Sequence, residues 1–257
     1  MKKFITSVAA LAALAYTTPA LSNEDPHNAT HATHWGYTGH TAPEFWGQLD
    51  PKFAMCGIGK NQSPINITKN VTLHTNDLDP IEFIYHAHAT EVVNNAHAIQ
   101  VNVDDHSSIN IDNKHFVLKQ FHFHSPSENE INGRSFPLEA HFVHIAKDGS
   151  LAVIAVLFEL GKPNATLAKI FETMPKKPHS TTALELSSED IEQLLPKERS
   201  YYRFNGSLTT PPCSEGVRWF VLKQYVSLSK EQLHQFTAVM EGNNRPTQPI
   251  NARKVLK

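Results

Sequence analysis

The sequence lacks an excess of charge of either sign. Its 257 residues contain 23 Lys and Arg against 25 Asp and Glu, so no basic surplus points to nucleic acid and no acidic tail points to a solvating role. No stretch after the N-terminus approaches about 18 uninterrupted apolar residues, and the run "LAVIAVLFEL" at 151–160 is too short to cross a membrane. We therefore expect neither nucleic acid nor a membrane as a partner.

From Trp35 onward the chain also lacks linkers, repeats, low-complexity runs and breaks in composition. These absences favour one domain, and the hydrophobic fraction of 40% suffices to fill a core. Residues 1–22 instead resemble a secretory signal peptide: Lys2 and Lys3 precede an apolar stretch, and small residues follow where cleavage would occur. The alternative is an amphipathic helix of the fold. We predict a signal peptide at 1–22, one mature domain at 23–257 that begins with a polar lead-in, and a periplasmic or secreted protein.

Cysteine is scarce. Cys56 and Cys213 are the two in the chain, and in an oxidising compartment two cysteines usually pair. On the chain-entropy model a disulfide closing so long a loop contributes about 4–5 kcal/mol as an upper figure. The alternative is two buried free thiols, and we predict the disulfide.

Strand patterns dominate the rest of the chain. β-branched and aromatic residues alternate with polar ones, with turn residues between, in five runs: 89–105, 107–124, 137–146, 151–160 and 216–228. "INGR" and "AKDGS" predict hairpin turns, because Asn-Gly and Asp-Gly accept positive φ. Three short helices are predicted after N-caps at Asn164, at Ser187 or Ser188, and at Ser229. The expected fold is mainly β (α+β): a single domain on a large twisted, mostly antiparallel central sheet of about ten strands, with a few short peripheral helices.

Histidine is abundant, with 16 copies, and two of them lie in "QFHFHSPSENE" at 120–130. On a strand, Gln120, His122 and His124 share one face, with the two histidine Cα atoms about 6–7 Å apart. An antiparallel return through "LEAHFVHIA" can bring His141 beside them, on the same face as Glu139. Three neutral imidazoles and an open fourth position form the ligand pattern of catalytic zinc sites.

Gln120 and Glu139 can orient the ligating rings, because a metal-bound histidine usually donates its other N–H to an oxygen. The plainer interpretation of one His-x-His is a solvated strand face. His86 and His88 have the same spacing without comparable partners, and we interpret them as exposed. Three further histidines, His97, His106 and His115, cannot be sorted by spacing, and His144 falls on the opposite face as a core residue.

Several ordered motifs resemble the α-class carbonic anhydrases, in particular the exported bacterial form. They are "HWGYTG", "NQSPINI", "NNAHAIQV", "QFHFH…SEN…EAHFVH", "GSLTTPPCSEGVRW" and "NNRPTQPINAR", and they extend from about Trp35 to near the C-terminus. The resemblance implies a zinc enzyme that reversibly hydrates carbon dioxide to bicarbonate and a proton, by attack of a zinc-bound hydroxide and with a histidine proton shuttle. It also implies a catalytic domain over 23–257 on a sheet of about ten strands.

The resemblance assigns roles by position. His122, His124 and His141 bind one Zn²⁺ per chain, and Gln120 and Glu139 orient them. Thr209 accepts a hydrogen bond from the zinc-bound hydroxide and donates to Glu128. The apolar pocket for carbon dioxide is lined by Val143, Val153, Leu208 and Trp219, and Thr210 contacts substrate or bicarbonate. His97 is the proton shuttle, with waters ordered by Tyr37, Asn95 and Gln100.

Two residues depart from the pattern of animal members. Ser125 replaces a common tryptophan, which suggests a more open or differently packed rim, and Phe204 replaces a frequent tyrosine, which removes one hydroxyl. These departures bear on rate and inhibitor preference. The resemblance also implies sulfonamide and anion inhibitors and allows a homodimer.

Two other function classes fit the sequence less well. A non-catalytic binding module of this family typically lacks a zinc histidine, whereas this chain has all three. The other class is a different zinc hydrolase, such as a cupin-like or peptidase-like enzyme. A protease would more usually show His-Glu-x-x-His on a helix, which this sequence lacks.

Overall fold

The computed structural model describes residues 33–257, and within them no helix is long and apolar enough to cross a membrane. The predicted signal peptide at 1–22 and most of the lead-in lie outside the described residues.

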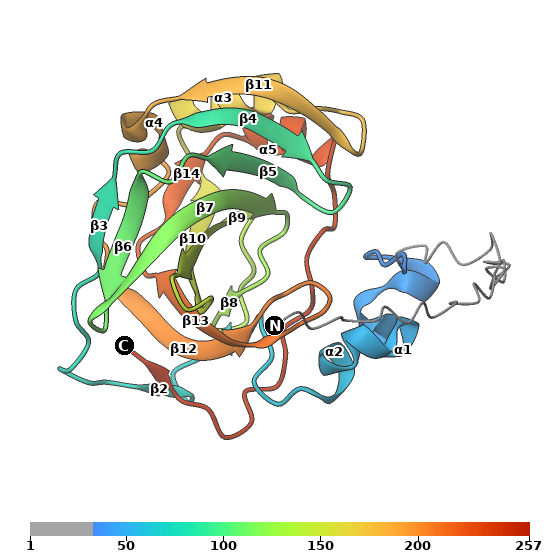
Figure 1. The fold of residues 1–257 in the computed structure, drawn as a ribbon, viewed down its shortest axis with the longest axis vertical. Helices are drawn as coiled ribbons and strands as arrows, with labels where there is room; N and C mark the ends of the chain where they lie inside the picture. The colour runs from blue at the N-terminus through green and yellow to red at the C-terminus, as the bar shows by residue number, and fades with distance from the viewer. Residues whose placement is uncertain (1–32) are drawn as a thin grey trace, which may run out of the picture. The chain divides into compact units, whose positions relative to one another are not determined.

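Most of the described chain is built on one sheet (Figure 1). The strands are β1 (Asn66–Ile67), β2 (Thr72–Leu73), β3 (Glu82–Tyr85), β4 (Ala89–Asn94), β5 (Ile99–Val103), β6 (Ser107–Ile111), β7 (Lys114–His124), β8 (Glu130–Ile131), β9 (Leu138–Ala146), β10 (Leu151–Leu160), β11 (Ser180–Leu186), β12 (Tyr201–Ser207), β13 (Glu215–Leu222), β14 (Val226–Leu228) and β15 (Val255–Leu256). Within residues 33–257, thirteen strands form the large sheet, and β1 pairs with β8 in a separate ribbon.

Ten strands follow one path across the large sheet, in the order β11-β4-β5-β7-β9-β10-β13-β12-β15-β2. The pairs β10–β13, β10–β14 and β15–β2 are parallel, and the other pairs in this sheet are antiparallel. The predicted fold class is therefore confirmed, with a few parallel pairings that periodicity does not reveal.

Turns divide three of the predicted strand runs into two strands each. Asp112 and Asn113 both adopt positive φ between β6 and β7, and Gly149, with φ 82°, closes the predicted β9–β10 hairpin. Asn132 and Gly133 likewise have positive φ in the predicted "INGR" turn. Side chains or glycines that tolerate the left-handed region thus mark where the chain reverses.

All three predicted helices form, although each is shorter than its pattern: α3 (Ala165–Thr173), α4 (Ser188–Glu192) and α5 (Lys230–Thr237). The side chain of Asn164 caps α3, and Ser187 and Ser229 form capping boxes with Asp190 and Gln232. The short elements α1 (Trp46–Leu49), α2 (Met55–Ile58), η1 (Gly39–Thr41), η2 (Pro43–Phe45) and η3 (Pro51–Phe53) were not predicted, because each is only one turn long.

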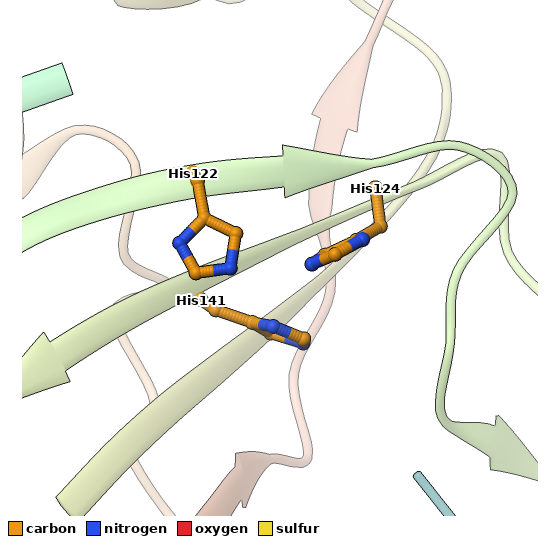
Figure 2. Close-up of side chains that lie close together, drawn as sticks. All are labelled: His122, His124 and His141. Atoms are coloured by element: carbon orange, nitrogen blue, oxygen red, sulfur yellow. The ribbon is translucent and has the colours of Figure 1, made fainter. Parts of the chain in front are cut away.

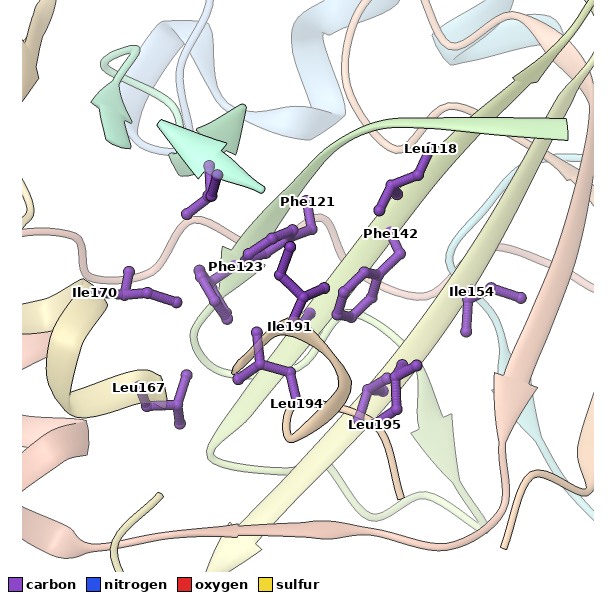
Figure 3. Packing of buried hydrophobic residues seen from close by; sticks show 14 of the residues in the cluster. Leu118, Phe121, Phe123, Phe142, Ile154, Leu167, Ile170, Ile191, Leu194 and Leu195 are labelled. Carbon is purple, nitrogen blue, oxygen red and sulfur yellow. The ribbon is translucent and has the colours of Figure 1, made fainter. Parts of the chain in front are cut away.

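The sheet buries apolar side chains on both faces. On one face Phe121, Phe123 and Phe142 pack under residues of α3, α4 and the segment after it (Figure 3). On the other face Val153 and Trp219 belong to a second, smaller cluster. Successive residues of β7, β9, β10 and β13 alternate between the two faces, so the strands that carry the site also hold the main core.

Candidate metal centre

Three histidines converge from two neighbouring strands. His122 and His124 lie on β7, and His141 lies directly opposite His122 on β9 (Figure 2). One nitrogen from each ring can be chosen so that all three lie within 4.8 Å of one another. The predicted antiparallel return is therefore confirmed in register and in side-chain direction.

The remaining nitrogen of each ring faces an oxygen. Nδ1 of His122 lies 2.8 Å from Oε1 of Gln120, and Nε2 of His141 lies 2.9 Å from Oε1 of Glu139. Nδ1 of His124 lies 2.7 Å from the backbone carbonyl of Asn243. Since these oxygens accept hydrogen bonds, the facing nitrogens carry the protons. The lone pairs of His122 Nε2, His124 Nε2 and His141 Nδ1 are left for a metal.

Burial keeps the three imidazoles neutral. Desolvation is the largest cause that lowers the pKa of each ring, and it is reinforced at His122 and His141 by neighbouring histidines. Nε2 of His124 is buried and has no hydrogen-bond partner within residues 33–257. Three neutral rings with one orphaned buried nitrogen fit a divalent cation with nitrogen preference, of which zinc is the common example.

Two carboxylates lie beneath the histidines, and both are buried. Glu139 accepts hydrogen bonds from the backbone N–H groups of Glu128 and Asn129, at 2.7 and 2.8 Å, and from the Asn129 amide at 2.7 Å. Glu128 accepts from the backbone N–H of Arg245 at 2.9 Å. Burial raises the pKa of both carboxyls, that of Glu128 to about 8, and the Arg245 N–H opposes the shift at Glu128. Glu128 is thus not an exposed loop residue.

Thr209 lies in the hairpin tip between β12 and β13. It is buried, and it lies close enough to lower the pKa of Glu128. No hydrogen bond within 3.5 Å joins the two, however, and Oε2 of Glu128 has no partner among residues 33–257. The tip is anchored by the predicted disulfide, which is present between Cys56 and Cys213. The amide of Gln62 also donates to the Cys213 carbonyl, at 3.0 Å.

A cavity of about 170 Å³ opens beside His122 and His124. Its lining includes the residues predicted for the proton path, Tyr37, Asn95, His97 and Gln100, and also Thr210, which was predicted to contact substrate or bicarbonate. The His97 ring is stacked on Trp35, with centroids 3.7 Å apart and planes 10° apart. Partial burial lowers the pKa of His97, as do His34 and His179 nearby.

The four residues predicted for the apolar pocket belong to one cluster. Val153 and Trp219 are buried in it, and Val143 and Leu208 pack against it. The Trp219 ring meets the His141 ring edge-on, with centroids 4.9 Å apart. An uncharged wall therefore adjoins the histidine cluster.

The other histidines behave largely as the spacing indicated. His86 and His88 are exposed. His144 is buried, with Nε2 2.9 Å from the Tyr85 hydroxyl and Nδ1 2.9 Å from the Phe142 carbonyl. Two that spacing left unsorted lie outside the centre: Nδ1 of His106 is 3.1 Å from Asp104 and Nδ1 of His115 is 2.8 Å from Asn110.

The two departures from the animal pattern are well packed. Ser125 is buried, and it donates its N–H to Asn243 and its hydroxyl to the Pro137 carbonyl, both at 2.9 Å. Ser125 is therefore held by two hydrogen bonds and does not open this part of the rim to solvent. Phe204 is buried in the second cluster, with its ring parallel to Trp219 at 6.0 Å between centroids.

Four supporting residues were not singled out from the sequence: Trp35, Asn129, Asn243 and Arg245. The buried guanidinium of Arg245 donates to Gln62 Oε1 and to the carbonyls of Ser63 and Cys56, at 2.8–2.9 Å. Asn243 and Arg245 lie in the motif "NNRPTQPINAR", which was matched as a whole without roles for its members. Their partners are more than 100 residues away, so spacing could not reveal them.

Comparison with known proteins agrees with this site. Residues 41–257 match the family model described as eukaryotic-type carbonic anhydrase. A carbonic anhydrase of Pectobacterium carotovorum is 46% identical over 230 residues, which cover 89% of this chain and 93% of that protein. One from Neisseria gonorrhoeae is 46% identical over 256 residues, covering 98% and 96%. The solved complex of the α-carbonic anhydrase of Thermovibrio ammonificans with the inhibitor sulfanilamide has a TM-score of 0.85 at 50% identity, covering 88% of this chain and 100% of that one. The chain therefore belongs to the eukaryotic-type, or α-class, family of carbonic anhydrases.

Proposed function

We propose that this carbonic anhydrase catalyses the zinc-dependent, reversible hydration of carbon dioxide to bicarbonate and a proton. The supporting observation is the set of three neutral imidazoles, each with its second nitrogen engaged by an oxygen. When bound, zinc supplies a Lewis acid that brings the pKa of a water to about 7, a known property of carbonic anhydrases as a class, and a positive charge that favours ionised carboxyls nearby.

His122 and His124 would hold the ion through Nε2, and His141 would hold it through Nδ1. Neutral imidazoles leave the metal its full positive charge. Three protein ligands also leave one of the four positions that zinc prefers for water or substrate. Gln120, Glu139 and the Asn243 carbonyl keep the rings in the ligating tautomer and orientation.

Thr209 orients the attacking oxygen. We expect its hydroxyl to donate to Oε2 of Glu128 once the metal is bound. Within residues 33–257 that oxygen is buried without a partner, and Oε1 accepts from the Arg245 N–H. Donation in that direction leaves the Thr209 oxygen free to accept a hydrogen bond from the nucleophile. A single proton position on Thr209 therefore fixes which lone pair of the nucleophile faces carbon.

Carbon dioxide binds against the apolar wall formed by Val143, Val153, Leu208 and Trp219. The molecule is apolar, so its site needs no charge. Thr210, which lines the adjacent cavity, contacts substrate or bicarbonate.

His97 carries the product proton to buffer. It is half-buried at the cavity, and we expect Tyr37, Asn95 and Gln100, which line the same cavity, to order the intervening waters. Its lowered pKa makes the imidazolium a readier donor to solvent.

The test is stopped-flow hydration of carbon dioxide, with zinc quantified in the same sample, for the wild type and His141→Ala. We expect about one zinc per chain and fast hydration that the substitution abolishes. The matched control is His88→Ala, which alters an exposed histidine of a His-x-His pair and should change neither quantity. Bound zinc without hydration would instead indicate a non-catalytic binding module. Full activity of His141→Ala would show that His141 is not a zinc ligand.

Two further expectations follow from the family. Sulfonamides and anions should inhibit at the metal, as supported by the sulfanilamide complex of the Thermovibrio relative. We place the enzyme in the periplasm or outside the cell, which the Cys56–Cys213 disulfide supports. A homodimer remains a prediction, to be checked by sedimentation.

A further inference from the structure

The sheet ladder ends beside the metal centre. β5 and β7 are antiparallel, and their last pair on this side is Ile99 with Phe123. Just beyond it, the carbonyls of His97 and Phe123 both accept hydrogen bonds from Nδ2 of Asn243, at 3.1 and 2.9 Å. Two carbonyls cannot hydrogen-bond to each other, whereas a primary amide has two N–H donors and can bridge them.

The rest of Asn243 is also engaged. Its Oδ1 accepts from the Ser125 N–H at 2.9 Å, and its backbone carbonyl faces Nδ1 of His124 at 2.7 Å. The residue is 1% exposed, so each lost bond would leave a buried polar group unpaired. One buried residue thus contacts the end of the ligand strand through its side chain and a metal ligand through its backbone.

His97 has two other tethers, and neither reaches the metal strand. Its N–H donates to Oδ1 of Asn95 at 2.9 Å within its own turn, where Ala96 has φ 75°. Its ring is stacked on Trp35. The Asn243 amide is therefore the contact that links the backbone of His97 to the end of β7, at the point where the β5–β7 pairing stops.

We propose that the Asn243 side chain is a positioning residue for proton transfer, because it fixes the backbone of His97 relative to the strand end that holds His124. This inference rests on the proposed zinc site and shuttle. The two halves of Asn243 are separable: substitution removes the amide but keeps the carbonyl that faces His124. Loss of the amide should therefore slow proton export more than it slows hydration.

The experiment measures kcat/KM, kcat at low buffer concentration and zinc content for the wild type, Asn243→Ala, His97→Ala and the double variant. We expect Asn243→Ala to lower kcat at low buffer concentration more than it lowers kcat/KM, because the backbone carbonyl that faces His124 is kept. Its kcat should fall about tenfold, within the roughly 10²-fold that a displacement of about 1 Å can cost. Added imidazole should restore kcat, and Asn243→Ala should have no further effect in the His97→Ala background.

Three outcomes overturn the inference. If His97→Ala lowers kcat and Asn243→Ala does not, the amide does not position the shuttle. If Asn243→Ala lowers zinc content and kcat/KM along with kcat, and imidazole does not restore it, the amide supports the metal centre instead. If His97→Ala leaves kcat unchanged while the wild type binds zinc and hydrates carbon dioxide, the shuttle assignment and this inference fail together, but the proposed reaction stands.

Discussion

Replacing His144 measures how much stability the protein loses at low pH because a buried imidazole stays neutral in the folded state. His144 lies on the face of β9 opposite His141, away from the three clustered histidines. It donates from Nδ1 to the Phe142 carbonyl and accepts at Nε2 from the Tyr85 hydroxyl. Burial lowers the pKa of His144 from 6.5 to about 3. A second proton, on Nε2, would create a buried charge on the ring. It would also face the Tyr85 hydroxyl, which already donates to Nε2.

The sign and size of the effect follow from proton linkage. Between pH 6.5 and about 3 the unfolded chain binds more protons at His144 than the folded chain, so stability falls as pH falls. The slope is about 1.36 kcal/mol per pH unit, which removes about 3 kcal/mol by pH 4.5 and about 5 kcal/mol by pH 3. Above pH 6.5 this contribution to stability is fully present.

Urea denaturation of the wild type and His144→Phe at several pH values between 7 and 4.5 measures the effect, because other titrating groups cancel in the difference. At pH 7 the variant should be less stable by about 1–3 kcal/mol, since the Tyr85 hydroxyl and the Phe142 carbonyl lose their partner. Between pH 7 and pH 4.5 the difference in stability should shift by about 3 kcal/mol in favour of the variant, which closes or reverses the gap. Parallel pH profiles, or an NMR titration of His144 with a midpoint near 6.5, would refute the reasoning.

Three other perturbations have defined outcomes. Replacing Cys56 and Cys213 by serine opens a loop spanning 157 residues and should lower the free energy of unfolding by up to about 5 kcal/mol, measured by denaturation against the oxidised wild type. An unchanged midpoint would contradict the loop-entropy account. Gly206→Ala places a Cβ 2.1 Å from Ser63 Oγ, so the melting temperature should fall by several degrees, whereas Gly57→Ala meets its nearest atom at 3.6 Å and serves as control. Equal melting temperatures for the two variants would show that the crowding relaxes freely. Removing the metal with a chelator should abolish hydration and lower the melting temperature, with both restored by zinc, because a ligand of the folded state stabilises it by mass action. Calorimetry with and without chelator checks this, and identical curves would argue against a site formed by the fold.

Much of the site could be predicted because it follows the period of two. The spacing of Gln120, His122 and His124 places them on one face, and Glu139 and His141 share the matching face of the next strand. The same rule assigned His144 to the core. The caps of α3, α4 and α5 were also predictable, since capping is decided within four residues.

The rest depends on contacts between distant segments. Asn243 and Arg245 adopt no regular element, so no periodicity marks them, yet each contacts a residue of the site. The parallel pairing of β10 with β13 is likewise set by packing between strands far apart in the chain. The bulge between Leu118 and Gln120 shifts the β7–β9 register by one residue, and only the pairing with β9 reveals it.

The alternation of site and core along β7 and β9 has a consequence for tolerance to mutation. From Gln120 to His124 every second residue faces the metal centre, and each residue between packs in the main core. On a strand with one solvated face, substitutions at alternate positions meet solvent and are harmless, as on β11, where Ala183 and Glu185 are exposed and Leu184 and Leu186 are buried. On this part of β7, a substitution on either face should be harmful. A saturation scan should therefore show unbroken intolerance across these five positions, so the sequence that encodes the catalytic centre can drift very little even where no residue contacts the metal.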